Sequence, residues 1–221
     1  MADDTSRQGN RYATPELLTW VDGVHAPHDE ALEQAFTAPG QQGMPAIMVG
    51  PSEGRALELL ARMVGARRIV EVGTLAGYST IWLARALGPG GKLWTLESEP
   101  AHAEVARRSL ERAGLGASVE ILVGPALDTL PTIERHGPFD VVFVDADKAS
   151  YDRYGQWAAA HVRPGGLLLG DNAYLFGELL GDSDRARAMR RFHEAAREYF
   201  HTVCLPTPDG LLLGVRKAPA A

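Results

Sequence analysis

The 221-residue sequence has little cysteine, little lysine and no long hydrophobic run. Its one cysteine, Cys204, excludes a disulfide within the chain. No apolar stretch approaches the roughly 18 residues that a membrane span needs. The first residues include Asp3 and Asp4 but no apolar segment of a secretion signal. These absences exclude a disulfide scaffold and a membrane span, and we expect a soluble, cytoplasmic protein.

Length and apolar content indicate one large globular domain. The residues are 45% hydrophobic, enough for a single core without a metal or disulfide to stabilise it. The net charge of −6 disfavours binding to polyanions. One basic cluster stands against this balance, and it is either the solvated face of a helix, which we favour, or a phosphate-binding surface. The cluster consists of Arg185, Arg187, Arg190, Arg191 and Arg197.

Short apolar runs alternate with segments of helical periodicity, which is typical of an α/β fold with a largely parallel sheet. Strands are predicted at 68–72, 92–97, 118–123, 141–145, 167–171, 202–205 and 211–215. The last two runs are too close for a parallel crossover, so we expect them to pair antiparallel at one end of the sheet. Helical stretches at 14–21, 29–36 and 52–63 precede the first strand.

The first strand leads into a glycine loop, Glu71-Val-Gly-Thr-Leu-Ala-Gly-Tyr-Ser79. Ligands of open α/β sheets bind beyond the carboxyl ends of the strands, where bare backbone allows close approach. A dinucleotide fingerprint would need glycines at 73, 75 and 78, but Leu75 and Tyr78 stand at two of these positions. Glu97, at the end of the second strand, suits the two hydroxyls of a ribose. A ribose is therefore predicted, although Glu97 does not say of which nucleotide.

Acidic side chains also follow the fourth and fifth strands. Asp145 and Asp147 precede Lys148, and Asp171 precedes Asn172. Each alone is explained as a helix cap or a surface charge. Because two strand ends converge, we favour a site for a hard cation such as Mg²⁺, Mn²⁺ or Ca²⁺, which prefers oxygen ligands.

Together with Gly124-Pro-Ala126, these segments resemble the S-adenosylmethionine-dependent, metal-requiring O-methyltransferases, and within them the bacterial relatives of caffeoyl-CoA and catechol O-methyltransferases. The resemblance runs from about residue 52 to 217. It implies a Rossmann-like class I methyltransferase fold, with a seven-stranded, mostly parallel sheet, one antiparallel strand and helices on both faces. It divides the chain into an N-terminal helical extension, 1–50, and a cofactor-binding domain, 51–221.

The resemblance also implies roles for single residues. In the cofactor site, Glu71, Gly73 and Ser79 would contact the methionyl part, Glu97 the ribose, Ala126 the adenine region and Asp147 the cofactor again. Asp145, Asp171 and Asn172 would bind the metal, with Mg²⁺ preferred, and Asp145 and Lys148 would serve catalysis, Lys148 beside the accepting hydroxyl. Tyr174, Leu175 and Phe176 are expected to line the acceptor pocket.

Such a reaction needs a nucleophilic oxygen held in line with an already activated methyl group. A phenol that coordinates a divalent cation has a pKa below its free value of about 10, and two neighbouring hydroxyls of one ring can chelate the cation. We therefore predict a catechol-like small molecule as the acceptor. Plant members have an asparagine where Phe176 stands, and the only lysines are Lys92, Lys148 and Lys217, which together argue against a CoA thioester.

Two other classes stay open. One is a methyltransferase for a hydroxylated tRNA base, which would need the arginine cluster as a phosphate-binding face. The other is a non-catalytic nucleotide-binding module, or an NAD enzyme, on the same kind of sheet. We expect a small phenolic substrate, no membrane partner and no nucleic acid. Because relatives of this kind are homodimers built partly from N-terminal helices, we also expect a homodimer.

Overall fold

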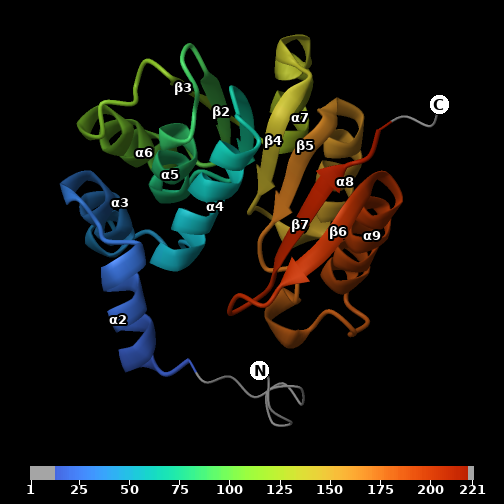
Figure 1. Cartoon of the computed structure of the whole chain (residues 1–221), viewed down its shortest axis with the longest axis horizontal. Helices are drawn as coiled ribbons and strands as arrows, with labels where there is room; N and C mark the ends of the chain where they lie inside the picture. The colour runs from blue at the N-terminus through green and yellow to red at the C-terminus, as the bar shows by residue number, and fades with distance from the viewer. Residues whose placement is uncertain (1–12, 219–221) are drawn as a thin grey trace.

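The computed structural model describes residues 13–218 as a seven-stranded sheet with helices on both faces (Figure 1). The strand order is β3-β2-β1-β4-β5-β7-β6. The strands are β1 (Arg68–Val72), β2 (Lys92–Glu97), β3 (Val119–Val123), β4 (Phe139–Val144), β5 (Val162–Gly170), β6 (Phe200–Leu205) and β7 (Leu211–Arg216).

Strands β1 to β5 pair in parallel, whereas β7 runs antiparallel to both of its neighbours, β5 and β6. This arrangement confirms the predicted fold class, including the single antiparallel strand near one end of the sheet. The strand order reverses direction between β1 and β4. A crevice opens at such a reversal, beyond the carboxyl ends of the strands, and it is where ligands of open α/β sheets bind.

Within residues 13–218 there are eight helices and three short 3-10 turns, of which α2, α3 and α4 precede β1 and the others connect the strands. The helices are α2 (Pro15–His25), α3 (Glu30–Gln41), α4 (Pro51–Met63), α5 (Tyr78–Arg85), α6 (Pro100–Arg112), α7 (Ala126–Ile133), α8 (Tyr151–His161) and α9 (Asp184–Tyr199), and the turns are η1 (Glu134–His136), η2 (Lys148–Ser150) and η3 (Leu175–Gly177). Side-chain caps fix several starts: Thr14, Asp29 and Ser183 each accept a hydrogen bond from a backbone N–H three residues on.

Alternate residues of each central strand serve two separate cores. Ile69 of β1 belongs to the core that helices α3 to α6 cover, and Val70 belongs to the one that helices α7 to α9 cover. Both faces of the sheet are therefore buried. This double burial explains why the strands read as continuous apolar runs rather than as alternating patterns.

Strands β4 and β5 begin earlier than the predicted 141 and 167. Asp140 interrupts β4, and its carboxylate accepts hydrogen bonds from the N–H groups of Arg67 and Arg68 and from the Arg163 side chain. Pro164, which has no N–H for the ladder, interrupts the first half of β5. A polar residue and a proline thus interrupt the apolar runs from which the starts of β4 and β5 were predicted. The ends of these strands beside the crevice lie within one residue of the prediction.

Helix α2 stands apart from the sheet, at the lower left of Figure 1. None of its residues, all within the described part of the chain, is buried. Helices α2 and α3 lie within the predicted extension, and the division at residue 50 stays a prediction. Cys204 lies half-buried on β6, where burial raises the pKa of its thiol. Among residues 13–218 no helix is long and apolar enough to cross a membrane; the cytoplasmic location stays a prediction.

Candidate active site

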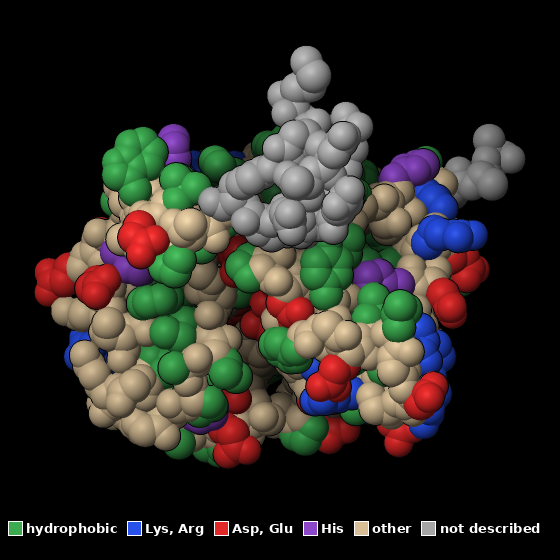
Figure 2. All heavy atoms as spheres, turned by 90° about the horizontal axis from the view of Figure 1, so that it is seen from below, with side chains coloured by type: hydrophobic (Ala, Val, Ile, Leu, Met, Phe, Trp, Pro, Cys, Tyr) green, Lys and Arg blue, Asp and Glu red, His purple; other side chains and the backbone are tan. Residues whose placement is uncertain are grey.

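A cavity of about 860 Å³ lies beyond the carboxyl ends of β1, β2, β4 and β5. Its wall is completed by the segment before α4 and by the turn between β6 and β7, which contribute Met48, Val49, Pro208 and Asp209. Figure 2 views this side of the molecule and shows a hollow with acidic side chains around it. The volume is within the range of small-molecule sites, about 300–1,000 Å³.

The glycine loop packs directly against the end of β4. Gly73 has a φ of 101°, and a Cβ there would lie 1.9 Å from the carbonyl oxygen of Asp145. A side chain at this position is therefore excluded by contact with backbone as well as by conformation. The loop that follows is held by Glu97, whose Oε2 accepts hydrogen bonds from the N–H groups of Thr74 at 3.2 Å and Leu75 at 2.8 Å.

Glu71 is fully buried behind the cavity wall. Its carboxylate accepts hydrogen bonds from the hydroxyls of Ser79 at 2.7 Å, Thr80 at 2.5 Å and Thr95 at 2.6 Å. Burial raises the pKa of Glu71 to about 7, although the three hydroxyls oppose the shift. Of the three residues expected to contact the methionyl part, Gly73 and Ser79 line the cavity. Glu71 does not line it, and its carboxylate orients the Ser79 hydroxyl from behind.

The other predicted cofactor residues lie on the cavity wall. Glu97, 7% exposed, ends β2, and its Oε1 accepts a hydrogen bond from the N–H of Glu99 at 3.0 Å. Ala126 begins α7, and Asp147 accepts a hydrogen bond from the Tyr154 hydroxyl. Burial and this bond to a carboxylate raise the pKa of Tyr154. The structure thus brings Gly73, Ser79, Glu97, Ala126 and Asp147 to one cavity.

The predicted metal ligands meet on the same wall. Asp145, Asp171 and Asn172 line the cavity, and Lys148 Nζ donates to Asp145 Oδ1 at 3.0 Å. The pKa of Asp171 is raised to about 7 by burial and by the negative charge of Asp145, and Lys148 opposes the shift. Two neighbouring carboxylates that repel each other, with an amide oxygen beside them, form a donor set that fits a hard divalent cation. Within residues 13–218 no group of three or more His, Cys, Asp or Glu side chains is arranged to hold a metal ion.

Two residues that bear on this wall were missed in the sequence: Glu53, which lines the cavity, and Tyr151, which does not line it but contacts Lys148 from the core. Tyr151 is fully buried; its hydroxyl accepts a hydrogen bond from Lys148 Nζ at 2.8 Å and donates to the Asp171 carbonyl at 3.0 Å. Burial raises the pKa of Tyr151 well above its usual value. Glu53, in the first turn of α4, lines the cavity, and its charge also raises the pKa of Asp171. The spacing of Tyr151 from Lys148 was a usable signal, whereas nothing in the sequence places α4 beside β5.

Of the three predicted acceptor residues, only Phe176 lines the cavity, with 62% of its surface exposed. Leu175 is buried in the core beneath α7 to α9, and the ring of Tyr174 packs against Gly210. The expectation for these two residues is corrected accordingly. Its physical reason is a turn with left-handed backbone at Asn172, Leu175 and Phe176, which directs successive side chains to different surroundings.

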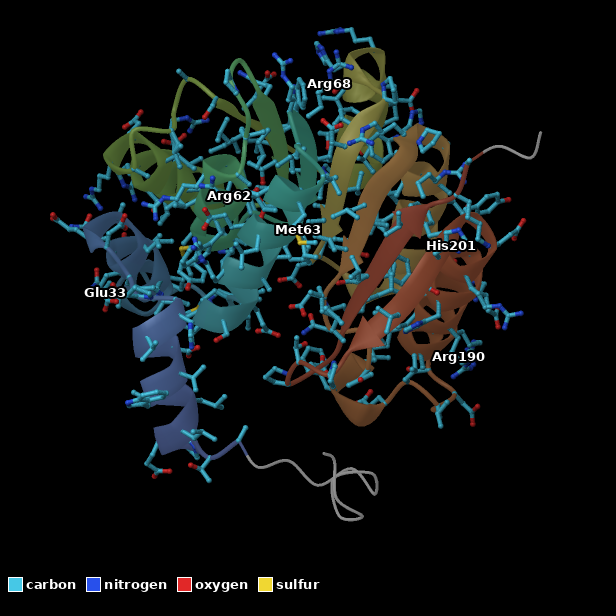
Figure 3. All side chains as sticks on the ribbon, in the orientation of Figure 1. Glu33, Arg62, Met63, Arg68, Arg190 and His201 are labelled. Atoms are coloured by element: carbon cyan, nitrogen blue, oxygen red, sulfur yellow. The ribbon has the colours of Figure 1, made fainter. Side chains whose placement is uncertain are left out.

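The arginine cluster lies along α9. Arg185, Arg187 and Arg191 form ion pairs with Glu178, Asp184 and Asp152. Arg190 donates to the carbonyls of Leu179 and Gly181. In Figure 3, Arg190 lies on α9 at the side of the molecule opposite Glu33 of α3. These contacts are those of a charged helix face with acidic neighbours, and they give no observation in favour of a phosphate-binding surface.

Comparisons with known proteins find similar sequences and structures among O-methyltransferases. Residues 24–217 match the family model described as O-methyltransferase. A catechol O-methyltransferase of Mycobacterium tuberculosis is 47% identical over 175 residues, covering 79% of each chain. An O-methyltransferase from Bacillus cereus in complex with S-adenosylhomocysteine superposes with a TM-score of 0.87 at 39% identity, covering 91% of this chain and 97% of that one. A Streptomyces achromogenes O-methyltransferase in complex with S-adenosylmethionine gives a TM-score of 0.86 at 38% identity, covering 92% and 96%.

Proposed function

The chain belongs to the O-methyltransferase family and is an S-adenosylmethionine-dependent enzyme, and from this premise we propose that it methylates a small catechol-like acceptor with the help of a divalent metal. The observation that carries the proposal is the meeting of Asp145, Lys148, Asp171 and Asn172 on one wall of the cavity that Gly73 and Glu97 also line. The name of the Mycobacterium tuberculosis relative supports the same acceptor class.

Asp145, Asp171 and Asn172 would hold the metal, Mg²⁺ by preference and Mn²⁺ or Ca²⁺ as alternatives. When bound, such an ion lowers the pKa of a phenol and orients two neighbouring hydroxyls. The protein's share is to hold two carboxylates close together despite their repulsion, which is reflected in the raised pKa of Asp171.

Lys148 would act on the proton of the accepting hydroxyl. Its ammonium group is held between Asp145 Oδ1 and the Tyr151 hydroxyl, with 16% of the side chain exposed. A cation in this place favours the ionised phenol and can relay the released proton. Tyr151 in turn is anchored to the Asp171 carbonyl, so the lysine and the metal ligands are positioned as one unit.

On the cofactor side, Glu97 would accept from the ribose hydroxyls and Ser79, oriented by Glu71, would contact the methionyl part. Ala126 would lie against the adenine and Asp147 would complete the site. Gly73 leaves room for close approach of the ligand to the backbone. These residues bind and orient the methyl donor, so that the transfer gains chiefly from alignment.

We further infer a homodimer. The support is α2, which exposes Leu17, Leu18, Trp20 and Val24 by 43% or more. Leu17, Trp20 and Val24 follow the spacing of one helical stripe. An exposed apolar stripe of this kind on a protein with a net charge of −6 is typical of an interaction surface.

The experiment is methyl transfer from labelled S-adenosylmethionine to catechol and to resorcinol, its isomer with separated hydroxyls. We expect methylated product from catechol only, since resorcinol cannot chelate one cation with both hydroxyls. Equal rates with both isomers would contradict the chelating role. Absence of product from both, with cofactor binding intact, would contradict the acceptor class.

A further inference from the structure

The turn between β6 and β7 forms part of the cavity wall and also supports another part of it. Thr207-Pro208-Asp209-Gly210 closes as a β-turn, with the Gly210 N–H donating to the Thr207 carbonyl at 3.2 Å. Proline at the second position and glycine at the fourth favour such a turn. Pro208 and Asp209 line the cavity.

This turn is bonded to the segment that follows the proposed metal ligands. The N–H groups of Ala173 and Tyr174 donate to the carbonyls of Gly210 and Asp209, both at 2.9 Å. The Tyr174 ring lies so close to Gly210 that a Cβ there would be 2.8 Å from it. The two segments therefore form one packed unit at the edge of the cavity.

Asp209 also contacts Phe176, and both residues line the cavity. Its Oδ1 accepts a hydrogen bond from the N–H of Phe176 at 2.8 Å. Leu175 and Phe176 have φ values of 52° and 54°, a left-handed conformation that non-glycine residues rarely adopt. Such a conformation persists only where surrounding contacts impose it, and the carboxylate of Asp209 supplies one at Phe176.

The other oxygen of Asp209 gives a second reason to assign it a role. Oδ2 is buried and has no hydrogen-bond partner within residues 13–218. Burying a carboxylate oxygen without a hydrogen-bond partner costs free energy of folding. The bond from the Phe176 N–H to Oδ1 is the gain that offsets this cost. A charged acceptor of that bond strengthens it, because bonds to ionised groups are stronger than neutral ones.

We propose that Asp209 is a positioning residue that fixes Phe176 against the acceptor, so that acceptor selectivity is set by the turn between β6 and β7. The proposal rests on the proposed function and takes Phe176, which lines the cavity, as the residue that faces the acceptor. Asp209 acts through the Phe176 backbone, and the cofactor side of the cavity is independent of it.

The test compares five proteins: wild type, Asp209→Ala, Asp209→Asn, Phe176→Ala and the double variant D209A/F176A. Asparagine retains an oxygen that can accept from the Phe176 N–H, so it is the matched control. Measurements are the cofactor Kd by calorimetry, the KM for 4-methylcatechol, and the ratio of its two monomethylated products. Hydrogen exchange of segment 173–178 in the ligand-free protein adds a readout that needs no activity.

For D209A we expect about tenfold faster exchange in 173–178 and about a tenfold higher acceptor KM, from loss of one bond to a charged group. The product ratio shifts, while the cofactor Kd stays within about twofold. D209N, which keeps an accepting oxygen but not the charge, shows a clearly smaller effect than D209A, and D209A adds little in the F176A background because both changes act on one residue.

The proposal is overturned by unchanged exchange in D209A, by an equal change in cofactor Kd and acceptor KM, or by full additivity with F176A. Should D209A not fold, Asp209→Glu, which keeps the charge but displaces the oxygen, takes its place with the same expectations. If wild type does not methylate catechols, the proposed function fails, and the exchange measurement still decides the role of Asp209.

Discussion

Glu71 and Asp171 each bury a carboxylate, and burial raises the pKa of each to about 7. The two differ in their partners. Glu71 is surrounded by three hydroxyls that orient Ser79, whereas Asp171 lies beside the like charge of Asp145. Glu71 is thus a hydrogen-bonded support for the cofactor side, whereas Asp171 and Asp145 form a pair of neighbouring carboxylates that fits a cation.

The raised pKa of Glu71 predicts a pH-dependent stability. Its folded pKa of about 7 exceeds the ordinary 4.5, so the folded state binds more protons between these values and the free energy of unfolding falls as pH rises through them. Glu71→Gln removes this term. In EDTA, the loss of stability between about pH 5 and pH 8 should be smaller in the variant, by up to about 3 kcal/mol.

Urea denaturation of both proteins measures this difference. Asp171 titrates in both and therefore cancels. An identical pH dependence of the two proteins would show that Glu71 keeps an ordinary pKa.

Tyr151 provides a second prediction. Tyr151→Phe removes the hydroxyl that accepts from Lys148 Nζ and donates to the Asp171 carbonyl. We expect a kcat reduced about tenfold, an unchanged cofactor Kd and a loss of about 1–3 kcal/mol in stability. Tyr154→Phe is the matched control, because its hydroxyl contacts Asp147 on the cofactor side. Steady-state kinetics and calorimetry distinguish them; a weaker cofactor Kd in Y151F with normal kcat would reverse the assignment.

How far the sequence predicts the site depends on where the chain enters it. Residues at or directly after a strand end, such as Glu97, Asp145 and Asp171, are located by the strand pattern alone, because parallel strands end at one edge. Glu53 and Asp209 enter from elements whose position is set by tertiary packing, so no local pattern places them. Leu175 was misplaced because its prediction rested on following Asp171 and Asn172 in the sequence, and the left-handed backbone of this turn directs its side chain into the core instead.

Among elements, the strands were the most predictable and the N-terminal helices the least constrained. Strands buried on both faces are recognised by continuous apolar runs, and β1 and β2 match the predicted ranges. Helix α2 has none of this burial within the described residues. Its apolar side chains are not accounted for by the core of the described chain, which is the basis of the proposed dimer.

The proposed dimer is tested on α2 itself. We expect wild type to have a mass of about 48 kDa by light scattering, twice the chain mass of 23.8 kDa. Trp20→Glu places a charge on the apolar stripe and should shift the mass toward 23.8 kDa. Thr19→Glu, an exposed position beside the stripe, should remain dimeric. A monomeric wild type, or equal masses for all three proteins, would rule out this interface.

At the scale of the whole molecule, the cavity is acidic beyond the needs of any one ligand. Seven carboxylates line it, from Glu53, Glu97, Glu99, Asp145, Asp147, Asp171 and Asp209, against Lys148 and His102. A surplus of this sign favours the sulfonium of S-adenosylmethionine and a divalent cation together. The fold concentrates it by ending four strands at one edge, so cofactor and metal share one electrostatic environment.

The metal requirement is the central claim, and a metal titration of methyl transfer tests it most directly. Enzyme stripped with EDTA is assayed with S-adenosylmethionine and catechol as Mg²⁺ is added, for wild type, Asp171→Asn and Asp128→Asn. Asp128 is an exposed residue of α7 away from the cavity wall and serves as the matched control. We expect no activity in EDTA, recovery with Mg²⁺ in wild type and D128N, and at least a tenfold higher Mg²⁺ requirement in D171N. Full activity in EDTA, or an unchanged requirement in D171N, would contradict the account.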